Sequence, residues 1–355
     1  MNTSEKLFST SHSVVVRLPN WVGDVVMATP ALRSLRRGYP GSQIYLQGKP
    51  KLLELLSGLD SFDDTVPLSS SRGQGLWYAA SALRRFRFDT GLLLPNSFSS
   101  ALIFFLGSVG NRIGYALNGR GCLLHRSLPI SARARKKAPQ PMTDYYLRIA
   151  RFAGGAAAGE RVELVTEDRM DAAAQAFLRD AGLLAQRPLV GLNIGSSFGP
   201  SKCWTAEGFA RVSDTIQTQL EGRSLLLCGP GEEEPARAII ARAERPIVDT
   251  SRAVMPLSLL KSVIKRLDLL VTTDTGPRHI AVAFGIPVVV LMGPTDLRYT
   301  ATNLDTSRVI RSPIDCAPCH KKECDREHQC MTNITSEMVL CEVVDLLQRR
   351  CVEAP

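Results

Sequence analysis

The hydrophobic pattern alternates between short β-branched runs and longer stretches with helical spacing. The run at Val14–Val16 is typical of a buried parallel strand. The segment after it repeats apolar residues along one helical face, namely Val25, Val26, Ala28, Leu32 and Leu35. Gly38-Tyr39-Pro40 marks the end of that helix, and Gln43–Gln47 is the next expected strand. This order predicts a βαβ unit.

The same order recurs along the rest of the chain. Strands followed by turn residues are expected near Asp89–Leu94, within PLVGLNIGSS, and at Ser224–Cys228, Leu269–Thr273 and Val288–Met292. This alternation predicts an α/β fold with mostly parallel sheets covered on both faces. We expect two Rossmann-like domains, residues 1–160 and 161–335, facing each other across a cleft that binds ligands at the strand ends. A flexible linker is expected around 153–159, and a C-terminal helix at 336–355 is expected to pack back on the N-terminal domain.

The composition is that of a globular protein of two domains. The chain has 355 residues, of which 45% are hydrophobic and 22% charged, and this excludes a largely disordered chain. No secretory signal pattern is visible, and the longest apolar stretches, 101–106 and 281–292, are too short to span a bilayer. We therefore expect a cytoplasmic protein without a transmembrane segment.

The positive charge is concentrated in the first half. Residues 1–160 carry 20 Lys and Arg against 9 Asp and Glu, a net charge of +11, whereas residues 161–355 carry 23 against 25. A basic first half suits an anionic partner, which is a nucleic acid, a phosphorylated glycolipid or an acidic membrane surface. A surface kept soluble by arginine is the alternative explanation.

Candidate chemistry begins in the loop after the first strand, Pro19–Asp24. Asp24 is expected at a helix N-terminus, where the helix dipole and free backbone N–H groups stabilise an ionised carboxylate. Such a carboxylate can act as a general base toward a hydroxyl group. An ordinary helix-capping aspartate explains the same position.

Two later loops offer groups that bind phosphate. Gly195–Lys202 supplies hydroxyls, backbone amides and one lysine, although a structural turn explains it equally well. In Thr273–His279 a strand ends in an acidic residue, and Thr275 and Gly276 begin a helix whose amides can face an anion. His279 is either part of that site or a hydrogen-bonded core residue.

A third loop, Gly229–Glu234, places carboxylates at a strand end. One of them can bind the hydroxyls of a ribose, or the group is a solvated acidic helix start.

In order and content these elements resemble the lipopolysaccharide heptosyltransferases, which are ADP-heptose-dependent, inverting glycosyltransferases of the two-domain GT-B type. The resemblance covers nearly the whole chain and is most specific in NWVGDVVMATPALRSL, IGYALNGRG and TDTGPRHIAVAFGIPVVVLMGPTD. The Asn-Trp-Val-Gly-Asp form resembles heptosyltransferase II more than heptosyltransferase I.

The resemblance implies residue roles at matching positions. Asp24 is expected as the catalytic base, and Lys202 as the lysine that contacts the donor phosphate. The other implied donor-binding residues are Ser196, Ser197, Glu233, Asp274, Thr275, Gly276 and His279. Arg278 is a local variation whose role the resemblance does not define.

The implied reaction transfers heptose from ADP-L-glycero-D-manno-heptose to the first heptose of the lipopolysaccharide inner core, in a heptosyl-Kdo-lipid A acceptor. Asp24 takes the proton of the acceptor hydroxyl, which attacks the anomeric carbon from the side opposite ADP. Backbone amides, hydroxyls and Lys202 stabilise the departing pyrophosphate. No Asp-x-Asp stands at a strand end, so no catalytic metal or other cofactor is expected to be required.

An anionic glycolipid acceptor at the inner leaflet of the inner membrane gives the basic first half a use. The resemblance therefore implies a cytoplasmic enzyme that is peripheral to that membrane. We predict acceptor contacts at Asn20, Trp21, Arg112 and Arg120, and acceptor or membrane contacts at Arg126 and in residues 131–137. A solvated basic surface is the alternative.

Four clustered cysteines, Cys316, Cys319, Cys324 and Cys330, have His320 and His328 between them. Their number suits a structural zinc site, although the spacing is not that of paired CxxC motifs. Reduced thiols in a packed loop, or an oxidised pair formed outside the cell, are the alternatives.

Other functions fit parts of the sequence. A heptosyltransferase of type I or III on the same pathway would share the donor motifs. A nucleic-acid-binding protein would use the basic half and a zinc-like cysteine cluster, but no basic recognition helix is evident. A Rossmann oxidoreductase ranks last because GxGxxG is missing after the first strand.

Overall fold

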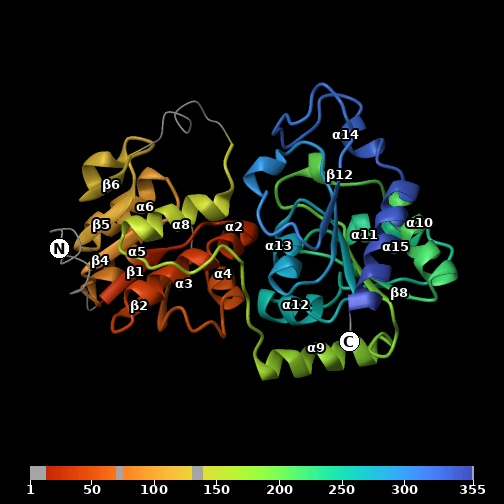
Figure 1. Ribbon diagram of the computed structural model, residues 1–355, viewed down its shortest axis with the longest axis horizontal. Helices are drawn as coiled ribbons and strands as arrows, with labels where there is room; N and C mark the ends of the chain where they lie inside the picture. The colour runs from red at the N-terminus through yellow and green to blue at the C-terminus, as the bar shows by residue number, and fades with distance from the viewer. Residues whose placement is uncertain (1–12, 69–74, 130–138, 354–355) are drawn as a thin grey trace. The chain divides into compact units, whose positions relative to one another are not determined.

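The computed structural model describes residues 13–68, 75–129 and 139–353, and the chain divides into two compact units (Figure 1). The first unit is Met1–Val165 with Arg298–Thr302, and the second is Thr166–Leu297 with Asn303–Pro355. Each unit is built on one parallel sheet of six strands. The predicted α/β fold is confirmed. Within the described ranges, no helix is both long and apolar enough to cross a membrane.

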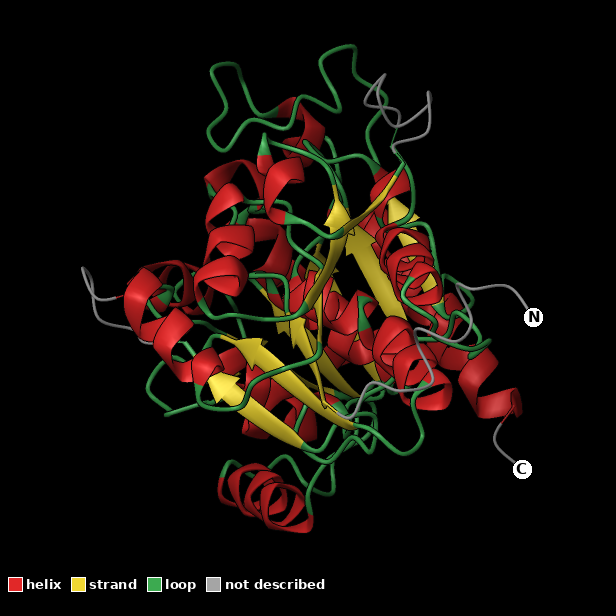
Figure 2. Cartoon of the chain, turned by 90° about the vertical axis from the view of Figure 1, so that its left-hand side faces the viewer, coloured by secondary structure: helices red, strands yellow, loops and turns green. Residues whose placement is uncertain are grey.

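The first unit has the strand order β3-β2-β1-β4-β5-β6. Its strands are β1 Ser13–Arg17, β2 Gln43–Gly48, β3 Asp64–Pro67, β4 Thr90–Leu93, β5 Asn111–Tyr115 and β6 Arg126–Leu128. Its helices are α2 Val22–Met27, α3 Thr29–Gly38, α4 Pro50–Leu55, α5 Gly75–Arg84, α6 Phe98–Leu106, the 3-10 helices η1 Arg120–Leu123 and η3 Leu297–Tyr299 at its boundary, and α8 Met142–Phe152. Helix α3 packs against α8, and α5 against α6, so that helices flank the strands (Figure 2). Strands covered on both faces are apolar throughout, as in the fully buried Val14–Val16.

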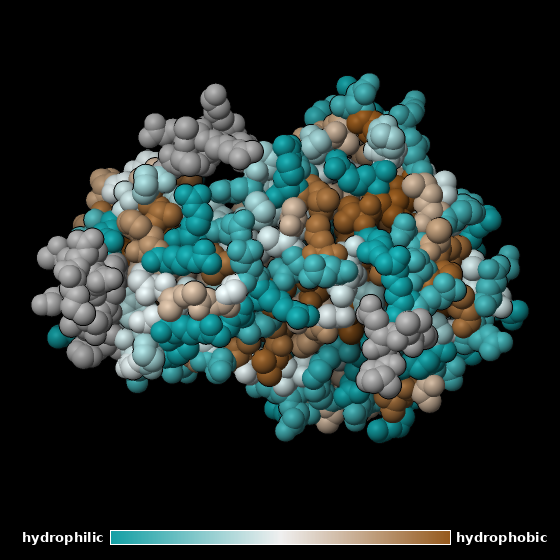
Figure 3. Space-filling model, in the orientation of Figure 1, coloured by the Kyte–Doolittle hydropathy of each residue, from teal (hydrophilic) through white to brown (hydrophobic). Residues whose placement is uncertain are grey.

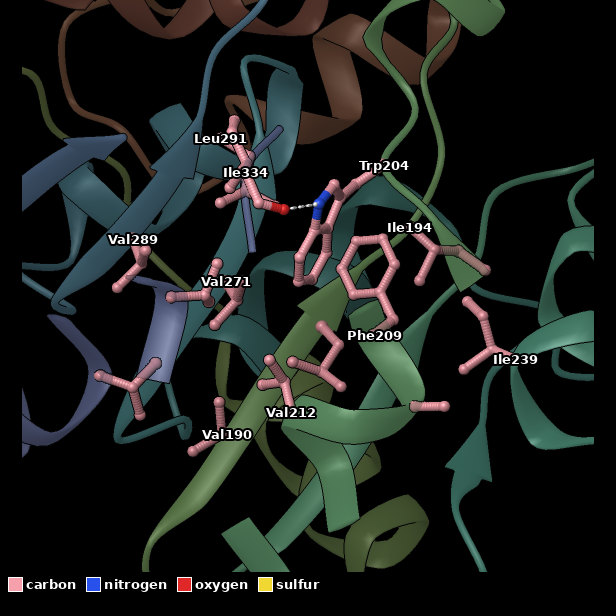
Figure 4. Packing of buried hydrophobic residues seen from close by; sticks show 14 of the residues in the cluster. Val190, Ile194, Trp204, Phe209, Val212, Ile239, Val271, Val289, Leu291 and Ile334 are labelled. Carbon is pink, nitrogen blue, oxygen red and sulfur yellow. Dashed lines mark hydrogen bonds between the residues drawn. The ribbon is translucent and has the colours of Figure 1, made fainter. Parts of the chain in front are cut away.

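The second unit has the strand order β12-β11-β10-β7-β8-β9. Its strands are β7 Leu189–Asn193, β8 Arg223–Leu227, β9 Val248–Asp249, β10 Leu269–Thr273, β11 Val288–Leu291 and β12 Ser307–Ile310. Its helices are α9 Asp168–Asp180, η2 Pro200–Lys202, α10 Ala206–Gln219, α11 Glu233–Ile240, α12 Leu257–Ile264, α13 Gly276–Ala283, α14 Gln329–Thr332 and α15 Ser336–Glu353. Figure 4 shows its core, where Trp204 lies edge-on to Phe209 and donates a 2.9 Å hydrogen bond from Nε1 to Ile334 O.

The C-terminal helix α15 packs on the second unit, against α10 and the strands β10, β11 and β12. Val339, Val343 and Leu346 follow each other at the spacing of one helical face and are buried in the core of that unit. We expected this helix to pack on the N-terminal domain. The structure differs because its apolar face belongs to the core beside β10–β12.

The glycine- and alanine-rich segment 153–159 is not a free linker. Ser34 Oγ donates to Ala156 O at 2.6 Å, and Arg33 Nε donates to Ala158 O at 2.9 Å, which ties the segment to α3. A Cβ added to Gly38 would lie 2.3 Å from Gly154 O, so the small residues serve a close approach of two backbones. The two units divide after Val165 instead.

Candidate active site

Four loops of the second unit emerge at one edge of its sheet. They follow β8, β7, β10 and β11, which are neighbours in the strand order, and parallel strands end on the same side. These loops contain the predicted phosphate-binding residues 195–202 and 274–276. This edge is where open α/β sheets bind their ligands.

Asp274, at the end of β10, joins three of the loops through its hydrogen bonds. Lys202 Nζ donates to the Asp274 backbone oxygen at 2.6 Å and to Oδ2 at 3.2 Å. Arg278 of α13 donates to Oδ1 at 2.6 Å, and Thr295, after β11, donates to Oδ2 at 2.9 Å. Asp274 and Lys202 are each 9% exposed and Arg278 is 1% exposed. The structure therefore brings the predicted residues Lys202 and Asp274 together.

The charges of this group do not cancel. Burial alone would raise the pKa of Asp274, but the neighbouring Lys202 and Arg278 outweigh it and hold that pKa well below its usual range. The Asp274 carboxylate thus contacts two cations, Lys202 and Arg278, beside the N-terminus of α13. Burial and the charge of Arg278 lower the pKa of His279 to about 3, so that its imidazole is neutral at pH 7.

The other predicted donor residues lie on the same loops. Thr275 is the N-cap residue of α13 and makes no side-chain cap hydrogen bond, and Gly276 is the first helical residue. Ser196 Oγ accepts a 3.3 Å hydrogen bond from Phe198 N, and Ser197 is exposed. These groups present amides and hydroxyls at the edge where Lys202 lies.

Asn193, which the sequence reasoning missed, fixes the hydroxyl of Thr275. Its Nδ2 donates to Thr272 Oγ1 and to Thr275 Oγ1, both at 3.0 Å. One feature of the sequence could have indicated Asn193, because it is the amide residue that ends an otherwise apolar strand. Strand β7 is buried along its whole length. A buried polar residue in such a strand needs partners, and these mark the site.

Glu232, rather than the predicted Glu233, faces the donor loops. A Cβ added to Gly195 would lie 1.7 Å from Glu232 Oε1, so the carboxylate covers the backbone of Gly195, and Glu232 Oε2 accepts a 2.6 Å hydrogen bond from Gly229 N. Burial raises the pKa of Glu232. Glu233 is exposed. Helix α11 begins at Glu233, which places Glu232 on the N-cap and turned inward, and the ribose contact at Glu233 stays a prediction.

The cysteine-rich segment supports the loop that carries Lys202. Ser201 N donates to Lys322 O at 3.1 Å, Ser201 Oγ donates to Lys321 O at 2.6 Å, and His328 Nε2 donates to Ser201 O at 2.6 Å. Gly199 adopts φ 151°, and a Cβ there would lie 2.5 Å from Lys322 O. Only glycine fits this close approach.

The predicted structural zinc is not supported. Cys316, Cys319, Cys324 and Cys330 line one cavity of about 610 Å³, but among the described residues no three or more His, Cys, Asp or Glu side chains are grouped as metal ligands. Cys330 packs instead against Gly293 in the core. Burial raises the pKa of its thiol to about 11, whereas metal binding requires the thiolate.

In the first unit, Asp24 lies in the first turn of α2 and is half-buried. Tyr146 of α8 donates a 2.9 Å hydrogen bond from its hydroxyl to Asp24 Oδ1. Burial, and then the charge of Asp24, raise the pKa of Tyr146 well above its usual value, so the phenol keeps its proton. Asn20 and Trp21, predicted acceptor contacts, are exposed beside Asp24. Tyr146 was not predicted, because no local pattern links it to a loop so distant in sequence.

Two arginines predicted as acceptor contacts make hydrogen bonds within the first unit. Arg120 is fully buried and donates to Tyr115 O, Pro95 O, Ser100 Oγ and Asn96 Oδ1. Arg112 donates to Leu123 O and Val109 O, both at 2.6 Å, and stacks on Phe105. Their donors are used by the fold. Arg126 lies over the Phe152 ring, and residues 131–137 lie outside the described residues.

A model described as glycosyltransferase family 9 (heptosyltransferase) matches residues 77–330. That match covers more than half of the chain and includes all four donor loops. The chain belongs to glycosyltransferase family 9. The predicted family resemblance is thereby confirmed, and the nucleic-acid-binding and oxidoreductase alternatives are set aside.

Similar proteins within family 9 span nearly the whole chain. Lipooligosaccharide heptosyltransferase 2 of Haemophilus influenzae is 27% identical over 353 residues, which are 95% of this chain and 100% of that protein. The family 9 glycosyltransferase structure of Veillonella parvula has a TM-score of 0.83 at 21% identity, with 96% and 98% of the two chains covered. The E. coli ADP-heptose lipopolysaccharide heptosyltransferase II structure has a TM-score of 0.76 at 25% identity, covering 95% and 99%. The predicted GT-B fold and the likeness to heptosyltransferase II are confirmed.

Replacement of the buried carboxylate tests the charge group. Asp274→Asn removes the buried carboxylate that both Lys202 and Arg278 contact, and should lower the free energy of unfolding by about 3–5 kcal/mol at pH 7. A carboxyl whose pKa is lowered by folding stabilises the fold above its ordinary value near 4, and loses that contribution as the pH falls below it. Urea denaturation at several pH values should therefore show the deficit shrinking from about pH 5 to pH 3.

The matched control is Asp345→Asn, which removes a partly exposed carboxylate of α15 that is paired with Arg349 and Arg308. Its effect should stay below about 1 kcal/mol. If the loss in free energy of unfolding caused by Asp274→Asn does not change with pH, the lost contact is not ionic.

Proposed function

We propose that this family 9 enzyme transfers heptose from ADP-L-glycero-D-manno-heptose to the first heptose of the lipopolysaccharide inner core, with inversion and without a metal. The observation that carries the proposal is the buried group of Lys202, Asp274 and Arg278 beside the amides of α13. A pyrophosphate matches the charge of Lys202 and those donors. The printed functions of the relatives supply the sugar and the acceptor.

In this proposal the second unit stabilises the leaving group. Negative charge grows on the pyrophosphate as the bond to the anomeric carbon breaks. The Lys202 ammonium and the amides at Thr275 and Gly276 are held in place before the reaction, so they stabilise that charge without reorganising. His279, being neutral, contributes packing or a hydrogen bond but no charge.

Asp24 of the first unit is the proposed general base. It takes the proton of the acceptor hydroxyl, whose oxygen then forms the new glycosidic bond as the bond to ADP breaks on the opposite side. Tyr146 holds one carboxylate oxygen by a 2.9 Å hydrogen bond and so fixes the orientation of the carboxylate. The reaction requires that this base and the donor loops act on the same pair of substrates.

Loss of the base should abolish turnover without loss of donor binding. Incubated with ADP-heptose, heptosyl-Kdo-lipid A and EDTA, the enzyme should add one heptose, detected by mass spectrometry. Asp24→Asn should lower kcat by about 10²–10⁴-fold, the usual contribution of a general base, while the Kd of ADP-heptose stays unchanged. Transfer to Kdo-lipid A that lacks the first heptose would indicate a different step of the pathway.

Tyr146→Phe is the companion variant, because it keeps the carboxylate and removes only the hydrogen-bond donor. It should lower kcat by about tenfold with the donor KM unchanged. Full activity of Asp24→Asn, or no product in EDTA from an enzyme that needs added metal, would contradict the mechanism.

The ribose contact is assigned to Glu232. Its carboxylate covers Gly195 between two donor loops, whereas the neighbouring Glu233 is exposed, and a carboxylate is a strong acceptor for paired hydroxyls. Glu232→Gln should weaken ADP binding by about tenfold, and Glu233→Gln should leave it unchanged. Isothermal titration with ADP measures both. Weaker binding by the Glu233 variant alone would restore the position predicted from sequence.

We further propose that the enzyme associates peripherally with an anionic membrane, which its acceptor lipid occupies. Hydrophobic residues interrupt the hydrophilic surface in several places (Figure 3). One exposed apolar side chain is therefore no evidence of a membrane-binding surface. Helix α6, however, has an apolar outer face of Phe98, Leu102, Phe105 and Leu106 in addition to its buried one. Residues 75–88 and 97–112, which include α5 and α6, contain four arginines and no carboxylate.

Vesicle co-sedimentation tests this association. Phe105 is 49% exposed on α6, and Phe105→Ser should reduce binding to vesicles that contain anionic lipid. The control is Met338→Ser on α15, where Met338 is 41% exposed in the acidic half of the chain. Equal loss with both variants, or binding that does not depend on anionic lipid, would contradict the proposal.

A further inference from the structure

Two arginines of the first unit are buried in different ways. Arg120 is fully buried and its donors are used by four oxygen acceptors. Arg17 is 8% exposed, yet its buried Nε and Nη1 have no hydrogen-bond partner among the described residues. No carboxylate is paired with it there. Hydrogen bonds among the described residues therefore satisfy the guanidinium of Arg120, but not Nε and Nη1 of Arg17.

Arg17 lies at a ligand-binding position of the sheet. It is the last residue of β1, and its register partners are Gln47 on β2 and Leu93 on β4. The chain runs from β1 to β2 and β3 on one side, and through β4, β5 and β6 on the other, so β1 and β4 form the switch point of the sheet. Ligands of open parallel sheets bind outside the strand ends at this point.

A second unsatisfied group lies beside Arg17. Gln47 is fully buried, and its Oε1 has no partner in the described part of the chain, while its Nε2 reaches Ala79 O on α5 only at 3.5 Å. Two adjacent polar side chains with unused capacity are uncommon in a protein interior. They place unsatisfied polar groups at the end of β1, the strand whose following loop carries Asp24.

The unpaired charge of Arg17 is a cost to folding. Burial lowers the pKa of Arg17 to about 10, so the guanidinium still carries its charge at pH 7. An apolar residue of the same length would avoid the desolvation of a cation that nothing compensates. A group kept at such a cost is expected to find its partner in a ligand.

We propose that Arg17 binds an oxyanion of the acceptor, a phosphate or a carboxylate, and holds it at the end of β1. This inference depends on the proposed function, since it requires an anionic acceptor. It gives Arg17 the acceptor-binding role that the sequence analysis predicted for Arg112 and Arg120. Nε and Nη1 lie on different edges of the guanidinium, so each can donate to a separate oxygen of the ligand. Both atoms and Gln47 Oε1 are buried, so binding requires that the Arg17 side chain move toward the ligand.

Replacement of each buried arginine by methionine separates binding from folding. Arg17→Met should not lower the thermal midpoint Tm, and should raise it, because it removes an uncompensated charge and fills the same space. It should weaken acceptor binding by about 10–100-fold, measured by titration without donor, and leave the Kd of ADP unchanged. Arg120→Met should lower Tm, because four oxygen acceptors lose their donors.

The probes identify the oxyanion without any turnover. In saturating ADP, which occupies the donor loops, inorganic phosphate or acetate should raise the Tm of the wild type but not of Arg17→Met. If a phosphate of the acceptor is the partner, a dephosphorylated acceptor should bind the wild type as weakly as the intact acceptor binds Arg17→Met. If a carboxylate is the partner, dephosphorylation should leave the difference between the two proteins intact.

Several results would overturn the proposal. Arg17→Met that loses stability as Arg120→Met does, with acceptor affinity intact, would make Arg17 a structural residue. Equal shifts of both proteins by phosphate and acetate would place the anion elsewhere. Failure of the proposed function is distinguishable, because then the wild type binds no acceptor, while the response of Tm to the small anions still reports on Arg17.

Discussion

The second unit is organised by the burial of one carboxylate between two cations. Charges removed from water must be compensated, and Asp274 can be compensated only if the loops after β7, β10 and β11 come to it. The same contacts set the position of Lys202. The contacts that satisfy the buried charges therefore also hold Lys202 where we propose that it meets the pyrophosphate. The apolar core around Trp204 supplies the rigid base on which the loops stand.

The first unit uses the opposite arrangement at the matching edge of its sheet. Asp24 receives a hydrogen bond from Tyr146, a neutral donor, and Arg17 receives no counter-charge from the described residues. A base that must accept a proton is served better by a phenol than by a paired cation, which would disfavour protonation. A cation that must hold a ligand is served better by an open guanidinium. At Arg17 the described residues leave donors unsatisfied, which gives up stability where the proposed function needs them.

Features that depend on short-range pattern could be predicted from the sequence. Strand and helix alternation, the parallel sheets and the loops that carry Lys202 and Asp274 are all encoded in periodicity and turn residues. Helix starts are less certain by a residue or two, and one residue turns a helix by about 100°, so the sequence alone does not show that Glu232 is the glutamate that turns inward. The number of charged residues in a segment does not show that, among the described residues, Arg17 has unpartnered donors and Arg120 has none. The burial and the hydrogen-bond partners of an arginine depend on segments distant in sequence. Likewise, small residues at 153–159 suggest flexibility and close packing alike, and only tertiary structure decides between them.

The cysteine-rich segment shows how a loop can be essential without supplying chemistry. It contacts the Lys202 loop through main-chain oxygens at Lys321 and Lys322, which accept hydrogen bonds whatever side chains these residues carry. Gly199 and His328 are different, because one must lack a Cβ and the other must donate to Ser201 O. The constraint on this segment is therefore on its backbone path, which two left-handed residues, His320 and His328, help to define. A displacement of that path would act on Lys202 through Ser201, and so on the whole charge group around Asp274.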